Sequence, residues 1–262
     1  MNICVCIKQV PASSNVKIDP VNGTLVRDGN NTKMNPYDLY AIETALKVKE
    51  MKDSQVRAIT MGPPAATDIL REAVWMGCDD GYLLTDRKFA GADVVATAFT
   101  LAQGIKYMGN YDLVVCGKQT TDGDTAQVGA ELAHFLQIPY VCYVDKVIEV
   151  KEKSIVVRTN LDKTYETLEI DFPCLITVEK NNDSPRLPSY KRSVQYSDHQ
   201  MHMVTFDKFF DNDESKYGLK GSPTQVERMF NPIKDDRKVM LKEEDGSYSS
   251  QLKEILKDGK FF

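Results

Sequence analysis

The stretch from Tyr111 to Gly129, YDLVVCGKQTTDGDTAQVG, limits the fold of this chain most strongly. It opens with a short apolar run, Leu113 to Cys116, which is typical of a buried parallel strand. A polar loop with two glycines and three threonines follows, and from Thr125 the spacing of the apolar residues becomes helical. The stretch therefore predicts a strand, a glycine-bearing loop and a helix in direct succession.

Such a loop is suited to bind phosphate, because free backbone N–H groups and the positive end of the helix dipole face the anion. The aspartates Asp122 and Asp124 favour contacts to ribose hydroxyls, or N-caps of the helix, over a grip on bare polyphosphate. The loop matches neither G-x-x-x-x-G-K-[ST] nor G-x-G-x-x-G. An ordinary strand-to-helix connection therefore stays open as the alternative.

The first 144 residues alternate apolar strand signals with helical signals. A helix is expected to begin at Pro36, with Asn35 as its N-cap. This order predicts an α/β fold with a doubly wound, mainly parallel, Rossmann-like sheet. The expected strands are Ile3–Val10, Gln55–Thr60, Asp80–Leu84, Leu113–Cys116 and Tyr140–Val144, and the later helices are Ala65–Trp75, Ala92–Tyr107 and Thr125–Leu136. Ligands of such sheets bind beyond the carboxyl ends of the strands, so the exits after Cys6, Thr60 and Cys116 are expected to meet in one crevice.

The pattern changes three times outside this alternation. Residues 16–27 carry two short β signals around Asn22-Gly23, which predict a hairpin inserted after the first strand. Residues 144–172 alternate apolar and polar side chains, which predicts an antiparallel extension before a last apolar strand, Phe172–Val178. Residues 181–262 contain few core residues, and we expect a surface loop followed by an arm that lies on another subunit. The domain boundaries expected are thus 1–180 and 181–262.

The charge and the cysteine content limit the classes of partner and site that this chain is expected to have. The 33 basic and 38 acidic residues give a net charge of −5, which argues against nucleic acid as the main partner. The six cysteines lie mostly in apolar runs without C-x-x-C spacing, and the three histidines form no metal-ligand pattern. Buried free thiols, no metal site and a reducing compartment are expected. The chain shows neither a signal peptide nor a run of membrane length, so a cytoplasmic protein is predicted.

Taken together, several segments resemble the beta subunit of an electron transfer flavoprotein. The resemblance runs in order and spacing from residue 1 to about the 190s, and it is specific as a combination. The segments that carry it are Val5–Pro11, Met34–Asp38 with Ala41, Glu43 and Ala45, Met61–Pro63, Gly117–Gln119 with Asp122, Gln127 and Gly129, and Pro185–Pro188.

The resemblance implies an adenine-nucleotide-binding sheet of the adenine nucleotide alpha hydrolase-like fold, paired with an alpha subunit that carries its own FAD. The loop around Pro185–Pro188 resembles the family's partner-recognition loop. Carried over by position, the cofactor-binding residues are Cys6, Asn35, Pro36, Tyr37, Asp38, Met61, Gly117, Lys118, Gln119, Thr120, Thr121, Asp122, Gly123, Asp124, Thr125, Ala126, Gln127 and Val128. No catalytic acid–base pair is implied.

Family members hold either AMP or a second FAD in this crevice. The residues that look like the electron-bifurcating, anaerobe-type members are Asp19-Pro20, Gly23-Thr24-Leu25, Arg27, Gly29, Asn35–Asp38 and also Lys8–Pro11. In those proteins NADH delivers a hydride to the second FAD. One electron then goes to ferredoxin or flavodoxin, and the other goes through the alpha-subunit FAD to an acyl-CoA dehydrogenase-like or lactate dehydrogenase-like flavoenzyme. A non-bifurcating electron carrier with AMP is the alternative.

Two other classes of protein with this sheet are disfavoured. An ATP-using enzyme would need a glycine-rich phosphate loop after the first strand, where this chain has Lys8–Ser14. A nucleotide-sensing protein of the universal-stress type would need G-x-x-G and a serine cluster after the fourth strand, and it would lack the long tail. Bound ATP in the purified protein would support either of them.

Overall fold

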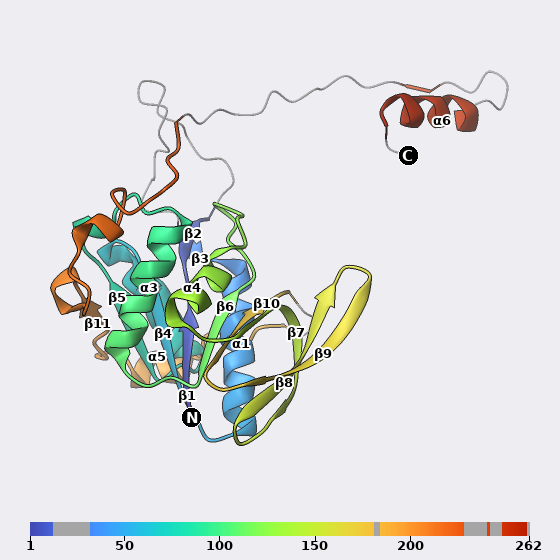
Figure 1. Ribbon diagram of the computed structural model, residues 1–262. Helices are drawn as coiled ribbons and strands as arrows, with labels where there is room; N and C mark the ends of the chain where they lie inside the picture. Colours follow the sequence, from blue (N-terminus) through green and yellow to red (C-terminus); the bar gives the residue numbers. More distant parts are fainter. Residues whose placement is uncertain (13–31, 181–183, 228–239, 242–247, 261–262) are drawn as a thin grey trace. The chain divides into compact units, whose positions relative to one another are not determined.

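The fold is described from a computed structural model of the chain (Figure 1). The structure describes residues 1–12, 32–180, 184–227, 240–241 and 248–260. The predicted hairpin at residues 16–27 and the motif residues 19–29 lie outside the described residues. The chain divides into a compact unit, Met1–Glu227, and a second unit, Arg228–Phe262, whose described helix is α6 (Tyr248–Asp258).

A nine-stranded sheet forms the centre of the first unit. All neighbours from β11 to β7 run parallel, whereas β7, β8 and β9 pair antiparallel. The sheet confirms the predicted α/β class with a mainly parallel sheet and an antiparallel extension. Across the sheet the order is β11 (His202–Val204), β5 (Asp80–Leu84), β4 (Gln55–Met61), β1 (Asn2–Cys6), β6 (Leu113–Gly117), β10 (Cys174–Val178), β7 (Tyr140–Val150), β8 (Ser154–Leu161) and β9 (Thr164–Asp171).

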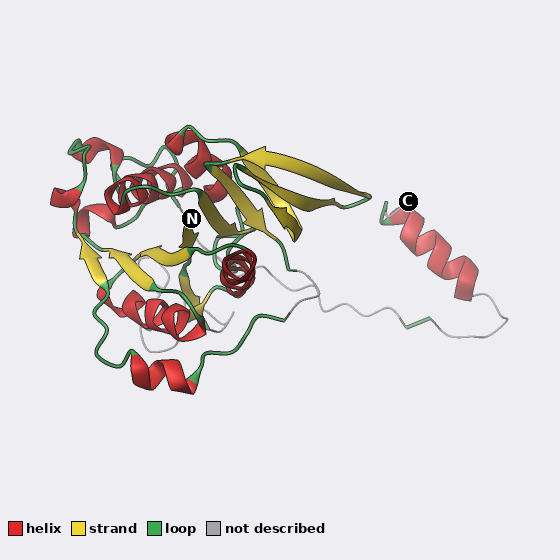
Figure 2. Cartoon of the chain, turned by 90° about the horizontal axis from the view of Figure 1, so that it is seen from below, coloured by secondary structure: helices red, strands yellow, loops and turns green. Residues whose placement is uncertain are grey.

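Helices cover both faces of the parallel part (Figure 2). Side chains of a strand alternate between faces, so Ile3 and Val5 of β1 pack with α1 (Pro36–Met51) and α2 (Thr67–Met76). Cys4 and Cys6 face the other way, toward α3 (Val94–Met108) and α4 (Val128–Leu136). The remaining elements are α5 (Tyr190–Gln195), a small antiparallel pair β2 (Gln9–Pro11) and β3 (Thr32–Met34), and the 3-10 turns η1 (Pro64–Ala66), η2 (Arg87–Phe89), η3 (Phe206–Lys208) and η4 (Glu214–Lys216).

Three predicted strands have limits that are wrong by two residues or more, and one of them, expected at Phe172–Val178, begins at Cys174. The strand expected at Ile3–Val10 ends at Cys6, and Gln9–Pro11 pairs with β3 instead. The chain leaves the sheet there because the Lys8 N–H bonds the Asp38 carboxylate rather than a neighbouring strand. The strand expected to end at Val144 runs on to Val150, and two irregularities in its pairing with β8 accommodate the turn in direction.

The compact unit extends to Glu227 rather than ending at residue 180. Tyr217, only 1% exposed, contacts four other aromatic rings at centroid distances of 5.1–5.8 Å: Phe89, Phe99, Phe206 and Phe209. Phe206, Phe209 and Tyr217 thus bury their rings against this chain's own η2 and α3, and β11 adds an edge strand beside β5. The expectation of an arm beyond residue 180 can therefore apply only to residues after 227.

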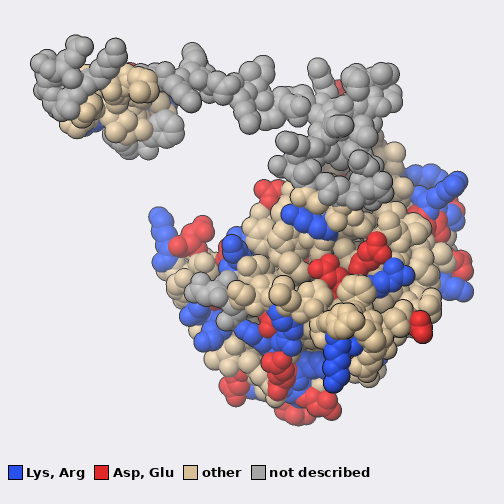
Figure 3. Space-filling model, turned by 180° about the vertical axis from the view of Figure 1, so that it is seen from behind, with Lys and Arg blue, Asp and Glu red and all other residues tan. Residues whose placement is uncertain are grey.

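On the face seen in Figure 3, basic and acidic side chains of the described residues are interspersed. This agrees with the small net charge of −5. In the described part of the chain no helix has the length and apolar character needed to span a membrane.

Candidate functional site

Three strand exits meet at the carboxyl edge of the sheet, as the topology predicts. Cys6 at the end of β1 lies in register with Ile59 of β4 on one side and with Cys116 of β6 on the other. The chain reaches Met61 and Gly117 one or two residues further on. From β1 the chain adds β4 and β5 on one side of the sheet and then β6 on the other side. These exits therefore lie at the switch point of the strand order, where proteins of this architecture bind ligands.

Asn35 and Asp38, at the start of α1, join these exits. The Asn35 side-chain nitrogen Nδ2 donates to Asp38 Oδ1 and to the main-chain oxygen of Gln119, both at 2.9 Å. Asn35 Oδ1 accepts from the N–H of Thr121 at 3.2 Å, and Asp38 Oδ2 accepts from the N–H of Lys8 at 2.7 Å. Two buried side chains therefore hold the exit of β1 and the loop after β6 against the first turn of α1.

The predicted capping role of Asn35 is only partly right. Asn35 is the N-cap residue of α1, but its side chain accepts no hydrogen bond from that helix. Asn35 is fully buried and Asp38 is 4% exposed, with their polar groups engaged inside the protein. Burial raises the pKa of Asp38 to about 7, although the bonds from Asn35 and from the Lys8 N–H act in the opposite direction.

Gly117 is required by the close approach of α1. A Cβ at this position would clash with the Asp38 carboxylate and would lie 2.9 Å from the carbonyl carbon of Tyr37. The glycine thus lets β6 pass directly under the first turn of α1. Gly123, in contrast, has only Thr120 Oγ1 near its ideal Cβ, at 3.7 Å.

The helix after the loop begins at Val128, not at Thr125. Asp124 and Ala126 have positive φ angles of 53° and 55°, which interrupt a helix that the apolar spacing alone predicts. The expected N-caps Asp122 and Asp124 are also wrong: Asp122 pairs with Lys8, and Asp124 accepts a hydrogen bond from Gln119 Nε2.

The N-terminus of α4 remains open to a ligand. Its N-cap is Gln127, and no side chain in the described part of the chain caps it. Thr121 to Thr125 are exposed. Ala126 has a positive φ angle and the next residue, Gln127, is in the αR region, an order that turns successive N–H groups toward one side. Neutral N–H, hydroxyl and amide donors at a helix start suit a phosphate and the hydroxyls of a ribose. The residues present therefore fit a nucleotide.

Two lysines frame this loop. Lys8 Nζ lies 2.8 Å from Asp122, and this cation holds the pKa of Asp122 below its usual range despite burial, which acts to raise it. Lys118 Nζ lies 2.9 Å from Glu179 Oε1, and this hydrogen bond raises the pKa of the lysine. Sequence reasoning missed Lys8 as a site residue because Lys8 lay inside the strand predicted at Ile3–Val10, which ends at Cys6 in the structure.

The predicted site residues fall into two groups. The bonds above bring together Asn35, Pro36, Tyr37 and Asp38 with the loop from Gly117 to Gln127. Met61 is the last residue of the neighbouring strand β4. Cys6 is 8% exposed and lies in register with Cys116 at the end of β1. Among the described residues, no group of three or more His, Cys, Asp or Glu side chains is arranged to hold a metal ion.

The fold and the polar loop at the carboxyl edge of its sheet define a doubly wound α/β protein with a nucleotide-compatible site at its switch point. The sequence matches the electron transfer flavoprotein domain family over residues 22–200. It is 46% identical over 228 residues to the electron transfer flavoprotein subunit beta of Clostridium acetobutylicum, covering 87% of each chain. It is 42% identical over 260 residues to the caffeyl-CoA reductase-Etf complex subunit CarD of Acetobacterium woodii, covering 97% of this chain and 98% of the relative.

A third relative, protein FixA of Sinorhizobium fredii, is 40% identical over 246 residues, covering 92% of this chain and 86% of the relative. The family match at residues 22–200 includes α1, the end of β4 and the loop before α4. The chain belongs to the electron transfer flavoprotein family, as a beta subunit.

Proposed function

We propose that the crevice binds FAD and that the protein is the NADH-oxidising half of an electron-bifurcating electron transfer flavoprotein. The observation that supports nucleotide binding is the open start of α4 beside the strand exits that Asn35 and Asp38 join. Support for bifurcation comes from the motif residues 19–29 and from CarD, whose name places it in a caffeyl-CoA reductase complex. AMP in a non-bifurcating carrier is the second candidate.

In this proposal the loop residues grip the diphosphate and ribose: Gly117, Gln119, Thr120, Thr121, Asp122, Thr125 and Gln127. Cys6, Asn35, Asp38 and Met61 shape the adenosine end. Since the polar atoms of Asn35 and Asp38 already bond within the protein, their part is to hold the loop in position. A bound flavin supplies the hydride- and electron-accepting chemistry, and the protein supplies binding, orientation and electrostatics.

The proposed partners are an alpha subunit with its own FAD, an acyl-CoA dehydrogenase-like or lactate dehydrogenase-like flavoenzyme, and ferredoxin or flavodoxin. The helix α6 has an exposed apolar stripe, Tyr248, Leu252 and Ile255, which suits an arm that packs on the alpha subunit. The loop at residues 182–190 would dock the flavoenzyme. The six cysteines are free thiols, which suits the proposed reducing cytoplasm.

The nucleotide content of the heterodimer tests this proposal. The chain is co-expressed with its alpha subunit, reconstituted gently with FAD, and extracted for chromatographic separation of FAD from AMP. Two FAD and no AMP per heterodimer are expected, followed by NADH-driven reduction of ferredoxin. One FAD with one AMP would leave a plain electron carrier, and extraction of ATP without flavin would contradict a flavin-binding function.

A further inference from the structure

The main chain of Lys8, just after the end of β1, is bonded on both sides to the start of α1. The N–H of Lys8 donates to Asp38 Oδ2 at 2.7 Å, and the main-chain oxygen of Lys8 accepts from the N–H of Asn35 at 2.9 Å. Asn35 is fully buried and Asp38 is 4% exposed. Two buried residues therefore fix the backbone from which the Lys8 side chain extends.

The ammonium group of Lys8 reaches the loop before α4. Its Nζ lies 2.8 Å from each carboxylate oxygen of Asp122, which is 114 positions away in the chain. The side chain of Lys8 is 45% exposed and that of Asp122 is 25% exposed, so water reaches both groups. Because an ion pair that is open to solvent contributes little to stability, its lysine can change partners at small cost.

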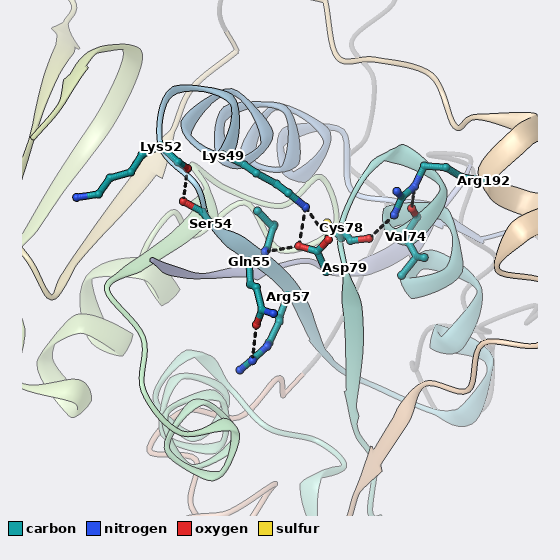
Figure 4. A network of polar contacts seen from close by, with 10 residues as sticks. Lys49, Lys52, Ser54, Gln55, Arg57, Val74, Cys78, Asp79 and Arg192 are labelled. Atoms are coloured by element: carbon teal, nitrogen blue, oxygen red, sulfur yellow. Dashed lines mark hydrogen bonds and ion pairs between the residues drawn. The ribbon is translucent and has the colours of Figure 1, made fainter. Parts of the chain in front are cut away.

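A second lysine–aspartate pair lies at the opposite edge of the sheet, before β5 (Figure 4). Lys49 Nζ lies 2.6 Å from both carboxylate oxygens of Asp79. Asp79 also accepts the N–H of Val56 at 2.8 Å and donates its own N–H to the main-chain oxygen of Val56 at 2.7 Å. This pair holds β4 to the start of β5, far from the strand exits, and it supplies a matched control for Lys8.

The loop before α4 carries two carboxylates where a phosphate is expected to bind. Asp124 accepts a hydrogen bond from the neutral amide of Gln119, and Asp122 is paired with Lys8. Lys118 is directed away from both, since its Nζ lies 2.9 Å from Glu179 Oε1. A diphosphate at the start of α4 would therefore meet charges of its own sign unless a cation turned toward it.

We propose that Lys8 changes partner when the nucleotide binds, leaving Asp122 and bonding the diphosphate. This inference rests on the proposed function, in which the loop holds the diphosphate and ribose of FAD. Once it is released, Asp122 can accept hydrogen bonds from the ribose hydroxyls. Lys8 then selects for a nucleotide with a diphosphate, such as FAD, over one with a single phosphate, because a charge-assisted bond grows with the charge of the acceptor.

The test titrates ADP, AMP and adenosine calorimetrically into the heterodimer after dialysis has removed the nucleotide from this site. ADP carries a diphosphate as FAD does, AMP carries one phosphate, and adenosine carries none. In Lys8→Gln we expect ADP to bind about tenfold more weakly, as the loss of a charge-assisted bond predicts, and adenosine to bind within about twofold of the wild type. The loss for AMP should lie between these two.

Two further variants serve as controls for this titration. Lys8→Arg keeps a cation at the same place and should bind ADP within about threefold of the wild type. Lys49→Gln removes the matched pair at the opposite edge of the sheet and should leave all three affinities unchanged. Thermal unfolding of each variant shows that it is folded at the temperature of the titration.

The double variant Lys8→Gln, Asp122→Asn separates a bond to the diphosphate from simple neutralisation of the loop. It removes the repulsion by an unpaired Asp122, so a bond from Lys8 to the diphosphate predicts that ADP still binds more weakly than in the wild type. Recovery of the wild-type affinity would overturn the inference, and so would equal losses for ADP and adenosine in Lys8→Gln. A wild-type protein that binds neither FAD nor any of the three probes would instead contradict the proposed function.

Discussion

The side chain of Asn35 donates a 2.9 Å hydrogen bond to the main-chain oxygen of Gln119, although 84 positions separate the two residues in the chain. This bond holds the first turn of α1 against the loop before α4. Replacement of Asn35 by Ala should lower the free energy of unfolding by about 1–3 kcal/mol, because it leaves a buried N–H and carbonyl unsatisfied. Nucleotide retained through gel filtration should fall with it; full retention would contradict this role.

A methyl group at Gly117 should damage the crevice more than one at Gly123. In Gly117→Ala the new Cβ would meet the Asp38 carboxylate and Tyr37, so we expect a loss of about 1–3 kcal/mol in stability and a loss of bound nucleotide. Gly123→Ala is the matched control for stability, since the new Cβ would meet only Thr120 Oγ1, at an ordinary contact distance of 3.7 Å. Thermal unfolding and nucleotide extraction measure both variants, and equal effects would argue against the close packing of β6 under α1.

Asp38 should make the protein less stable as the pH rises. The folded-state pKa of about 7 lies above the ordinary value of 3.8, so between these values the folded state holds a proton that the unfolded chain has released. Stability from this group is therefore present below about pH 4 and is lost as the pH rises through 7, by roughly 4 kcal/mol at most.

The variant Asp38→Asn removes this titration. Its free energy of unfolding, measured by denaturant titration at several pH values, should fall less steeply between pH 4 and 7 than that of the wild type. Asp162→Asn, in the exposed turn between β8 and β9, should keep the wild-type slope. Parallel curves for Asp38→Asn and the wild type would show that Asp38 titrates normally.

Lys8 should matter for nucleotide affinity more than for stability. Its partner Asp122 lies 2.8 Å away, and the lysine side chain is 45% exposed, so Lys8→Gln should change the free energy of unfolding by less than about 1 kcal/mol. The unpaired carboxylate of Asp122 should then repel the phosphate of the nucleotide. Calorimetric titration should therefore show weaker nucleotide binding. Lys151→Gln, which removes the Lys151–Glu169 pair on the antiparallel extension, should leave binding unchanged.

Tyr217 should hold residues 206–217 onto the body of the protein. Its ring is 1% exposed among four other aromatic rings, and its hydroxyl donates to the main-chain oxygen of Asp211. Tyr217→Ala should cost about 3–5 kcal/mol in thermal or denaturant unfolding. Phe210→Ala, at a position that is 76% exposed, should stay within about 0.5 kcal/mol of the wild type; a similarly small effect at Tyr217 would contradict its core role.

Much of the sheet follows from local sequence. Short apolar runs bounded by turn residues predict β4, β5 and β6 to within a residue, because those strands are buried on both faces. The predicted strand limits are wrong where contacts between distant residues determine the structure. Lys8 leaves the sheet to bond Asp38, and β11 is a three-residue edge strand without its own apolar run. The predicted start of α4 is wrong because the spacing of apolar residues does not encode the positive φ angles at Asp124 and Ala126.

The meeting of the strand exits at the candidate site could be predicted from topology, since parallel strands end at one edge of the sheet. The bonds that build it could not. Asn35 looked like a helix cap in its local sequence, and only the folded chain shows that its amide reaches Gln119. The aromatic cluster around Tyr217 was missed because its members come from four separate segments, and Phe206, Phe209 and Tyr217 lie where apolar residues are sparse in the sequence.

The place of β10 in the sheet has a consequence for synthesis of the chain. β10 lies between β6 and β7, both of which leave the ribosome earlier. Until Val178 has emerged, β6 and β7 each present an unpaired edge, and such edges recruit other chains. The nascent protein must therefore stay open through most of its translation, and a chain that stops before Cys174 should aggregate rather than form a smaller nucleotide-binding domain.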